Sequence, residues 1–254
     1  MSTTNKVALI TGGSRGLGRN MAVAIAKKGI DVLITYNTNS KAAEEVVSEI
    51  KSIGRNAAAL QLDTSRINSF DAFVKEFTGW LQVNTANSKL DFLINNAGTA
   101  LYSPIKDVKE EQVDHIFDIH YKAVVFLTQK LLPLMNDGGG VINISSGLTR
   151  ITNPGSAVYA SVKTAVETFT RYLAKETGDR KIRANVVAPG AIETDFGNGR
   201  VRDNPDINKH IAEITALGRV GLPDDIGGVV AFLCTEDAYW INGQRIEVSG
   251  GQAL

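Results

Sequence analysis

The sequence predicts an α/β protein built on a single doubly wound parallel sheet, and two observations carry this prediction. Short apolar runs alternate with amphipathic stretches of helical period along the chain, as in a parallel sheet covered on both faces. The chain has 254 residues and contains no internal repeat, low-complexity tract or linker. Because α/β folds of this length are often one domain, we expect a single domain over residues 1–254.

Seven apolar segments are expected as strands, which gives a sheet of about seven strands with helices on both faces. Phe70 and Phe77 stand at helical spacing and are expected in the core. The segment Glu110–Met135 is expected to form a long helix that turns Val113 and later apolar residues inward, and a second long helix begins near Pro154. The expected strands are Val7–Thr11, Val32–Thr35, Ala57–Leu62, Phe92–Asn95, Val141–Ser145, Ala184–Val187 and Arg245–Val248.

Composition argues against several classes of function. Lysine plus arginine equal aspartate plus glutamate at 27 each, so charge favours neither nucleic acid nor an acidic membrane. The one cysteine, Cys234, is expected as a buried structural thiol, and three scattered histidines give no metal signature. No apolar run reaches membrane-spanning length and Met1–Lys6 is polar, so we expect a cytoplasmic protein without a secretory signal.

A glycine-rich turn follows the first expected strand and leads into a helical pattern. Glycine at such a turn lets the backbone approach a pyrophosphate, which the helix N-terminus attracts. The turn predicts a nucleotide-binding Rossmann sheet, in which ligands bind beyond the carboxyl ends of the strands. It comprises Gly12, Ser14, Arg15, Gly16, Leu17 and Gly18.

Three polar residues later in the chain can act on a carbonyl group. Tyr159 and Lys163 are four residues apart, so on a helix their side chains share one face. That spacing alone also fits a solvated helix face, and the glycine turn favours the catalytic interpretation. An ammonium beside the phenol favours phenolate and lowers the tyrosine pKa from its ordinary value near ~10. Ser146, at a strand end, can hydrogen-bond the oxygen that gains or loses the proton.

Five motifs in this order resemble the short-chain dehydrogenase/reductase family over Val7 to Gly251. They are the TGxxxGxG turn, Asn95–Gly98 (NNAG), Ser146, the YxxxK pair, and Pro189-Gly190 with Thr194. The resemblance implies that Tyr159 is the acid in reduction and the base in reverse. It further implies that Lys163 lowers the Tyr159 pKa and holds the nicotinamide ribose, while Ser146 polarises the substrate oxygen.

The resemblance implies a nicotinamide dinucleotide, and the residues after the second strand bear on which one. NAD-selective folds place Asp or Glu there, whereas this chain has Tyr36-Asn37-Thr38. Without a carboxylate a 2′-phosphate is not repelled, and Arg15 can donate to it, so we expect NADP(H), with NAD(H) as the alternative. Asp63 resembles the family's adenine-binding aspartate and could equally cap a helix. Further cofactor contacts are expected from Thr64, Asn95, Ala97, Gly98, Tyr159, Lys163, Pro189, Gly190, Ile192 and Thr194.

The chain departs from the family pattern at two positions. His120 stands where the family has a catalytic asparagine on a locally kinked helix, and it is either a structural replacement or a proton relay. Ser249 stands where an aspartate usually precedes the glycine pair, in the region that packs subunits in family tetramers. The resemblance therefore implies a homotetramer or homodimer.

These features predict an NADP(H)-dependent oxidoreductase that transfers a hydride between the nicotinamide and a ketone or secondary alcohol. A β-ketoacyl-acyl carrier protein reductase is the alternative enzyme, which a basic entrance patch including Arg180 would favour. A nucleotide-sensing regulator without catalysis is the third interpretation, disfavoured because the serine, tyrosine and lysine are all present. The segment near 191–217, rich in glycine and asparagine, is expected as a mobile substrate lid.

Overall fold

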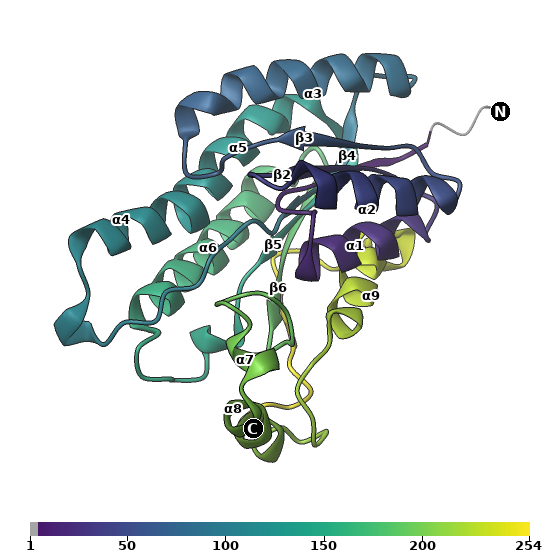
Figure 1. Ribbon diagram of the computed structural model, residues 1–254. Helices are drawn as coiled ribbons and strands as arrows, with labels where there is room; N and C mark the ends of the chain where they lie inside the picture. The colour runs from purple at the N-terminus through teal and green to yellow at the C-terminus, as the bar shows by residue number, and fades with distance from the viewer. Residues whose placement is uncertain (1–4) are drawn as a thin grey trace.

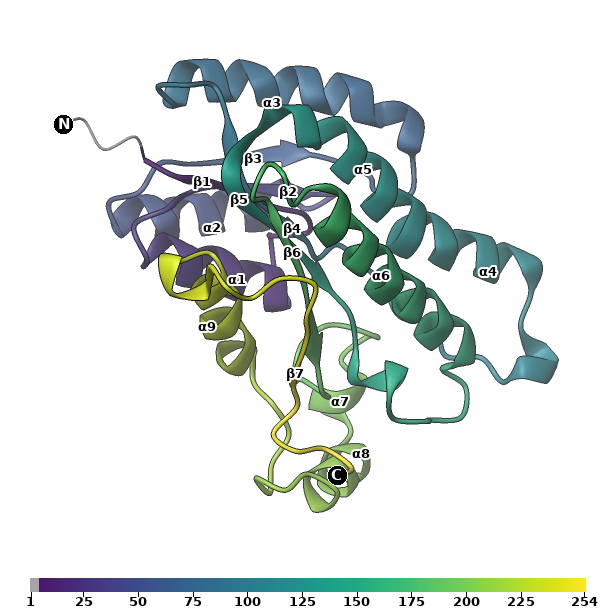
Figure 2. The same ribbon diagram turned by 180° about the vertical axis from the view of Figure 1, so that it is seen from behind.

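The computed structural model describes residues 5–254, and its elements alternate as the sequence predicts. Residues 1–4, which belong to the expected 1–254 domain and to the polar segment Met1–Lys6, lie outside the described residues. Within residues 5–254, seven strands form one parallel sheet in the order β3-β2-β1-β4-β5-β6-β7, which confirms the predicted fold class (Figures 1 and 2). The strands are β1 (Val7–Ile10), β2 (Asp31–Tyr36), β3 (Ala57–Gln61), β4 (Leu90–Asn95), β5 (Met135–Ile144), β6 (Arg183–Pro189) and β7 (Arg245–Val248).

Helices cover both faces of this sheet. One layer consists of α1 (Gly16–Ala26), α2 (Ser40–Ser52) and α9 (Pro223–Leu233). The opposite layer consists of α3 (Phe70–Asn84), α4 (Glu110–Phe117), α5 (Ala123–Leu131) and α6 (Ala157–Glu176) (Figures 1 and 2). Two short helices, α7 (Arg200–Asp203) and α8 (Pro205–Glu213), follow β6 and lie beyond the strand ends.

The core has two parts because successive strand residues face opposite layers. Leu9 of β1 packs with the α3 phenylalanines Phe70 and Phe77, while its neighbour Ile10 packs with residues of α1 and α9. All these side chains are fully buried. Central strands buried on both faces read as continuous apolar runs, which is why the sequence revealed them.

The helix predicted over 110–135 is interrupted, and the prediction that Val113 lies in the core is wrong. A π turn over Asp118–Lys122 separates α4 from α5. Such a turn inserts an extra residue and shifts the helical phase, so apolar positions before and after it do not share one face. Leu127 is therefore buried, whereas Val113 is 36 % exposed.

A buried carboxylate ties the end of β5 to β7. Glu167 on α6 accepts hydrogen bonds through Oε1 from Ser145 Oγ (2.7 Å) and Thr149 Oγ1 (2.9 Å). The same oxygen accepts from Arg245 Nε at 2.9 Å. The arrangement fixes the chain on both sides of Ser146, because Ser145 and Thr149 flank it.

The network continues to the last residues of the chain and accounts for the departure at Ser249. Its hydroxyl donates to Glu247 Oε1 at 2.9 Å, so a carboxylate two residues earlier stands near the place where the family has aspartate. Arg150 donates to Glu247 and to the Gln252 carbonyl (2.7 Å). Gln252 Oε1 accepts from the Ala191 amide at 2.9 Å, which holds the C-terminal segment against the end of β6.

Cys234 is buried at the end of α9, and burial raises the pKa of its thiol to about 12. Within residues 5–254, no cluster of three or more His, Cys, Asp or Glu residues is placed to hold a metal ion. In the same part of the chain, every helix is too short or too polar to span a membrane.

Candidate active site

A cavity of about 1020 Å³ lies at the carboxyl ends of the central strands. It collects residues from the turns after β1 to β6 and from the segment that contains α7 and α8. This position is the one expected for the ligand site of an open α/β sheet. The predicted residues in its wall are Gly12, Arg15, Gly16, Leu17, Gly18, Tyr36, Asn37, Asp63, Thr64, Ala97, Gly98, His120, Ser146, Tyr159, Lys163, Pro189, Gly190, Ile192 and Thr194.

The glycine turn forms a cradle that side chains would fill. Gly12 has a φ of +66° and lies so close to Ala97 that a Cβ would contact its Cα at 2.9 Å. A Cβ on Gly18 would overlap the Gly12 carbonyl. Helix α1 begins at Gly16 without a side-chain cap, so its first amides are available to an anion. The cradle fits the pyrophosphate of a dinucleotide.

Asn96 holds this cradle in place, although the sequence did not single it out. Its side-chain amide donates to the carbonyls of Thr11 (2.9 Å) and Gly12 (3.1 Å). The amides of Asn96 and Ala97 donate to Thr11 Oγ1 at 2.9 and 3.0 Å. The turn after β4 is thereby fastened to the turn after β1.

The Asn95 side chain, expected to contact the cofactor, does not reach the cavity. Its side-chain amide is buried and donates to Thr128 Oγ1 (3.1 Å) and Asn143 Oδ1 (2.8 Å), inside the molecule. Neighbouring residues of a strand face opposite sides, so Asn95 and Asn96 cannot both reach the cavity.

Ser14 and Thr38 also lie outside the cavity wall. Thr38 is exposed, because the chain has already turned toward α2. Asn39 caps that helix by accepting from the Ala42 amide at 3.0 Å. Ser14 lies in the glycine turn between wall residues without joining the wall itself.

The nucleotide end of the cavity carries one basic residue, Arg15, and one acidic residue, Asp63. Arg15 is exposed and pairs with no carboxylate among residues 5–254. Tyr36 ends β2 and Asn37 follows it, so the end of this strand places no carboxylate in the wall. Asp63 lines the cavity and also caps its own turn, accepting from the Ser65 amide (2.9 Å) and hydroxyl (2.7 Å).

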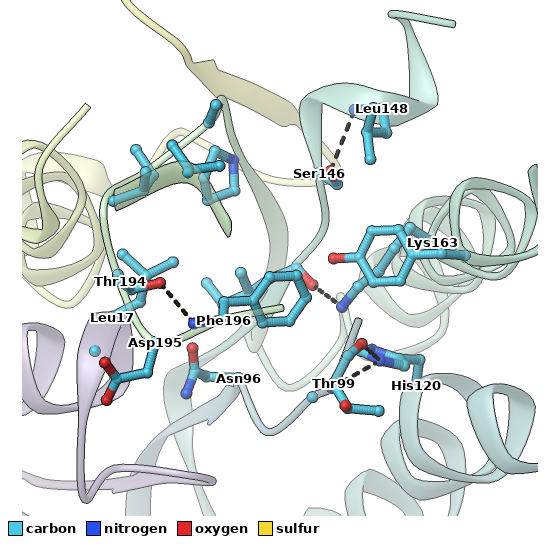
Figure 3. Close-up of a pocket in the computed structure, with 18 of the residues that line it drawn as sticks. Leu17, Asn96, Thr99, His120, Ser146, Leu148, Lys163, Thr194, Asp195 and Phe196 are labelled. Atoms are coloured by element: carbon cyan, nitrogen blue, oxygen red, sulfur yellow. Dashed lines mark hydrogen bonds between the residues drawn. The ribbon is translucent and has the colours of Figure 1, made fainter. Parts of the chain in front are cut away.

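The catalytic candidates meet at the other end of the cavity. Tyr159 and Lys163 lie on the first turns of α6, with Lys163 Nζ 5.8 Å from the Tyr159 ring centroid. Nζ donates to the Ile144 carbonyl at the end of β5 at 2.7 Å. Ser146 follows β5, and its Oγ accepts from the Leu148 amide at 3.2 Å (Figure 3).

Burial dominates the proton affinities of this pair. It lowers the Lys163 pKa from 10.5 to about 7, so the ammonium releases its proton near neutral pH. Burial also raises the Tyr159 pKa, with a smaller contribution from Tyr102, while the Ser146 hydroxyl acts in the opposite direction. The phenol is therefore protonated at neutral pH in this structure, in contrast to the lowered pKa expected from the lysine.

His120 lies in the π turn, at the position where the family's helix kinks. Its ring meets that of Tyr159 edge-on, with centroids 5.3 Å apart. Nε2 lies 2.8 Å from the Thr99 carbonyl oxygen and 3.1 Å from its amide nitrogen (Figure 3). Burial, followed by the nearby Lys163, lowers the His120 pKa well below its ordinary value, so the imidazole is neutral.

Arg180 does not belong to the cavity entrance. It precedes β6, and its guanidinium donates to Asp137 Oδ1 (2.8 Å) and to the carbonyls of Leu132 (2.9 Å) and Met135 (2.7 Å). These residues surround the amino end of β5, whereas the cavity lies at the carboxyl ends. Arg180 therefore does not form the basic entrance patch that would favour a carrier-protein substrate.

Several wall residues escaped the sequence prediction because they come from loops and helix ends without a motif. The segment expected as a lid supplies part of the wall, as does the chain after β4. The residues missed are Thr35, Leu62, Ser65, Asn96, Thr99, Tyr102, His115, Ile119, Leu148, Ile151, Phe196, Arg200, Ile207, His210, Ile211, Ile214 and Gln252, among others.

Comparison with known proteins places this geometry in a family. Residues 12–253 match a family model described as enoyl-(acyl carrier protein) reductase. The chain is 36 % identical over 261 residues to the hydroxynaphthalene reductase-like protein Arp2 of Metarhizium brunneum, covering 98 % of this chain and 96 % of the relative.

Two solved structures share the fold over nearly their full lengths. The promiscuous reductase LugOII, which catalyses keto-reduction at C1 during lugdunomycin biosynthesis, superimposes with a TM-score of 0.93 at 36 % identity, covering 100 % of both chains. The angucycline C-6 ketoreductase LanV, solved with bound NADP, gives 0.93 at 34 % identity, covering 98 % of this chain and 95 % of LanV. The protein therefore belongs to the short-chain dehydrogenase/reductase family and is an oxidoreductase.

Proposed function

We propose that this protein is an NADP(H)-dependent reductase of ketones, which also oxidises the corresponding secondary alcohols, with Tyr159 as acid and base. One observation carries the proposal: a single cavity joins a glycine cradle and Arg15 at one end to Ser146, Tyr159 and Lys163 at the other. The keto-reduction named for LugOII and the NADP bound to LanV support it.

The cavity wall offers a place for each part of the dinucleotide. The amides of the glycine turn would hold the pyrophosphate, and Arg15 with Asn37 would hold the 2′-phosphate. Pro189, Gly190 and Thr194 would contact the nicotinamide carboxamide. When bound, the nicotinamide supplies or accepts the hydride.

The side chains of the chain itself manage the proton. In reduction, the Tyr159 hydroxyl donates its proton to the carbonyl oxygen, which the Ser146 hydroxyl polarises by a hydrogen bond. A protonated Lys163 beside the phenol stabilises the phenolate that forms. Its pKa of about 7 allows this lysine to carry the charge and to return a proton near neutral pH.

The other interpretations lose support. Arg180, the residue that would favour a carrier-protein substrate, is engaged at the opposite end of the sheet. A regulator without catalysis does not require the assembled trio.

The lid near 191–217, the homotetramer or homodimer and the cytoplasmic location stay predictions. Trp240, 99 % exposed beside the half-exposed Tyr239, supports association with another copy.

The proposed function is tested by NADPH oxidation with a panel of ketones, aldehydes and acyl thioesters, repeated with NADH. We expect turnover of ketones with NADPH. Consumption of NADPH with acyl thioesters alone, or with no substrate of any class, would overturn the proposal.

Arg15→Ala should weaken NADP(H) binding by about 2 kcal/mol relative to NAD(H), because a charge-assisted contact to the 2′-phosphate is lost. Tyr36→Asp should shift the preference toward NAD(H), because the carboxylate repels that phosphate. Dissociation constants from calorimetry measure both effects. Arg19→Ala, next to the turn but paired with Glu49, is the matched control and should change neither constant. Equal turnover of NADH and NADPH by the wild type would contradict the assignment.

Tyr159→Phe removes the ionisable oxygen and keeps the ring, so it should abolish turnover and spare NADPH binding. General acid catalysis typically supplies a factor of about 10²–10⁴. Single-turnover kinetics and fluorescence titration of NADPH measure the two quantities. A loss below about tenfold would remove Tyr159 from the mechanism.

Lys163→Met should stabilise the fold, and the gain should shrink as pH rises. Near pH 6 the ammonium is charged in both the folded and unfolded chain, so the full cost of burying charge falls on the folded state. Above about pH 7 the folded protein releases the proton, while the unfolded chain holds it until about 10.5. Wild-type stability relative to the variant should therefore rise by about 1.4 kcal/mol per pH unit in this window.

Urea unfolding at several pH values between about 6 and 9 measures this dependence. Lys106→Met, at an exposed lysine, is the control and should show no such trend. A stability difference between Lys163→Met and wild type that stays constant with pH would show that folding does not lower the pKa of Lys163.

His120→Asn should stay within about tenfold of wild-type activity, a change of under roughly 1.4 kcal/mol in the barrier. The π turn supplies a backbone kink that survives side-chain replacement, so a relay through Lys163 can persist. The pH dependence of kcat/KM distinguishes the two roles left open for the imidazole. Loss of one ionisation would show that it relays protons, and inactivation of a folded, NADPH-binding variant would show chemistry that asparagine cannot replace.

A further inference from the structure

The cavity has a second half that the cofactor and the catalytic trio do not explain. Its wall is formed by the chain after β4, the end of α4 with the π turn that follows, the chain after β5, and the segment with α7 and α8. About half of these side chains are polar, among them Arg200, Asp206 and His210, and the others are aliphatic or carry the aromatic rings of Tyr102 and Phe196. The aliphatic and aromatic side chains include Tyr102, Ile119, Leu148, Ile151, Phe196, Ile207, Ile211 and Ile214.

Phe196 projects across the cavity beside the catalytic phenol. Its ring centroid lies 6.0 Å from that of Tyr159, with the planes inclined at 56°. The Phe196 amide donates to Thr194 Oγ1 at 3.2 Å, which fixes the backbone from which the ring extends (Figure 3). The side chain is 41 % exposed, so it lines the cavity without entering the core.

Tyr102 approaches the same place from the chain after β4. Arg200 lies over its ring, with Cζ 4.7 Å from the centroid. Gly197 leaves room for the phenol, because a Cβ there would lie 3.0 Å from Tyr102 Cε2. Tyr102 is near enough to Tyr159 to raise its pKa. Two aromatic rings from separate segments thus line the same cavity as the catalytic phenol.

We propose that Tyr102 and Phe196 select the substrate, which is a planar ketone whose carbonyl belongs to or adjoins an aromatic ring system. Aromatic faces favour offset or edge-to-face contact with another aromatic ring, beyond the gain from burying apolar area. A saturated ring of the same size gains only the burial. The inference rests on the proposed ketone reduction, since it places the ring relative to the carbonyl held at Tyr159 and Ser146.

The pair β-tetralone and β-decalone tests this selectivity, because the two ketones share a carbon skeleton and differ in aromaticity. Wild type should show the higher kcat/KM with β-tetralone. In Phe196→Leu and Tyr102→Leu, the ratio of the two kcat/KM values should fall by about tenfold, mainly through the KM for β-tetralone. Tyr102→Phe keeps the ring and should keep the ratio. Tyr172→Leu, at an aromatic residue on the outer face of α6, is the matched control.

Binding to the NADP-loaded protein separates failure of this inference from failure of the proposed function. Calorimetry should show β-naphthol binding more tightly than β-decalol, with the advantage lost in the two leucine variants, whether or not any ketone turns over. Equal affinity of wild type for the two alcohols, or equal loss of both ketones in the variants, would overturn the aromatic selection. Tight β-naphthol binding without any ketone turnover would overturn the ketone reduction and leave the ring contact in place.

Discussion

The site depends on one buried charge, the Lys163 ammonium. Its Nζ donates to the Ile144 carbonyl and lies 5.8 Å from the centroid of the Tyr159 ring. The hydrogen bond connects α6 to the end of β5, two residues before Ser146. Burial penalises the charged form and brings the pKa to about 7. Groups whose pKa is strongly shifted by burial tend to occur at functional sites, where the buried charge lowers folding stability and makes the group reactive.

The surrounding polar network keeps the serine in reach of this lysine. Glu167, one turn further along α6, accepts from residues on both sides of Ser146 and from Arg245 of the edge strand. Because the carboxylate is buried with three donors, its loss would leave the Ser145 hydroxyl and Arg245 Nε without their acceptor, although Arg245 would still pair with Glu247. The helix that carries the tyrosine and lysine therefore also positions the serine. The last strand and the C-terminal segment join the same hydrogen-bond network through Arg245 and Gln252.

The fold was predictable because buried parallel strands leave an unbroken apolar signal, and the family was predictable because short motifs identify it. What failed depends on tertiary contacts. Strand β5 begins at Met135 rather than Val141, because the glycine-rich stretch before Val141 carries no apolar run that would predict a strand. The choice between Asn95 and Asn96 depended on which side chain faced the sheet interior. Tyr102 and Phe196 carry no motif, and only the folded chain brings them together.

His120 shows how a departure from a family pattern can be accommodated. The imidazole presents one nitrogen, Nε2, to both backbone groups of Thr99, so either neutral tautomer finds a partner there. Within residues 5–254, Nδ1 is buried without a hydrogen-bond partner. Nδ1 can therefore either donate or accept, because Nε2 keeps a hydrogen bond to Thr99 in both tautomers. The ring that carries Nδ1 is in contact with Tyr159. In an asparagine side chain the nitrogen always donates and the oxygen always accepts. In histidine each ring nitrogen can do either, and here the ring lies beside a lysine that titrates near neutral pH.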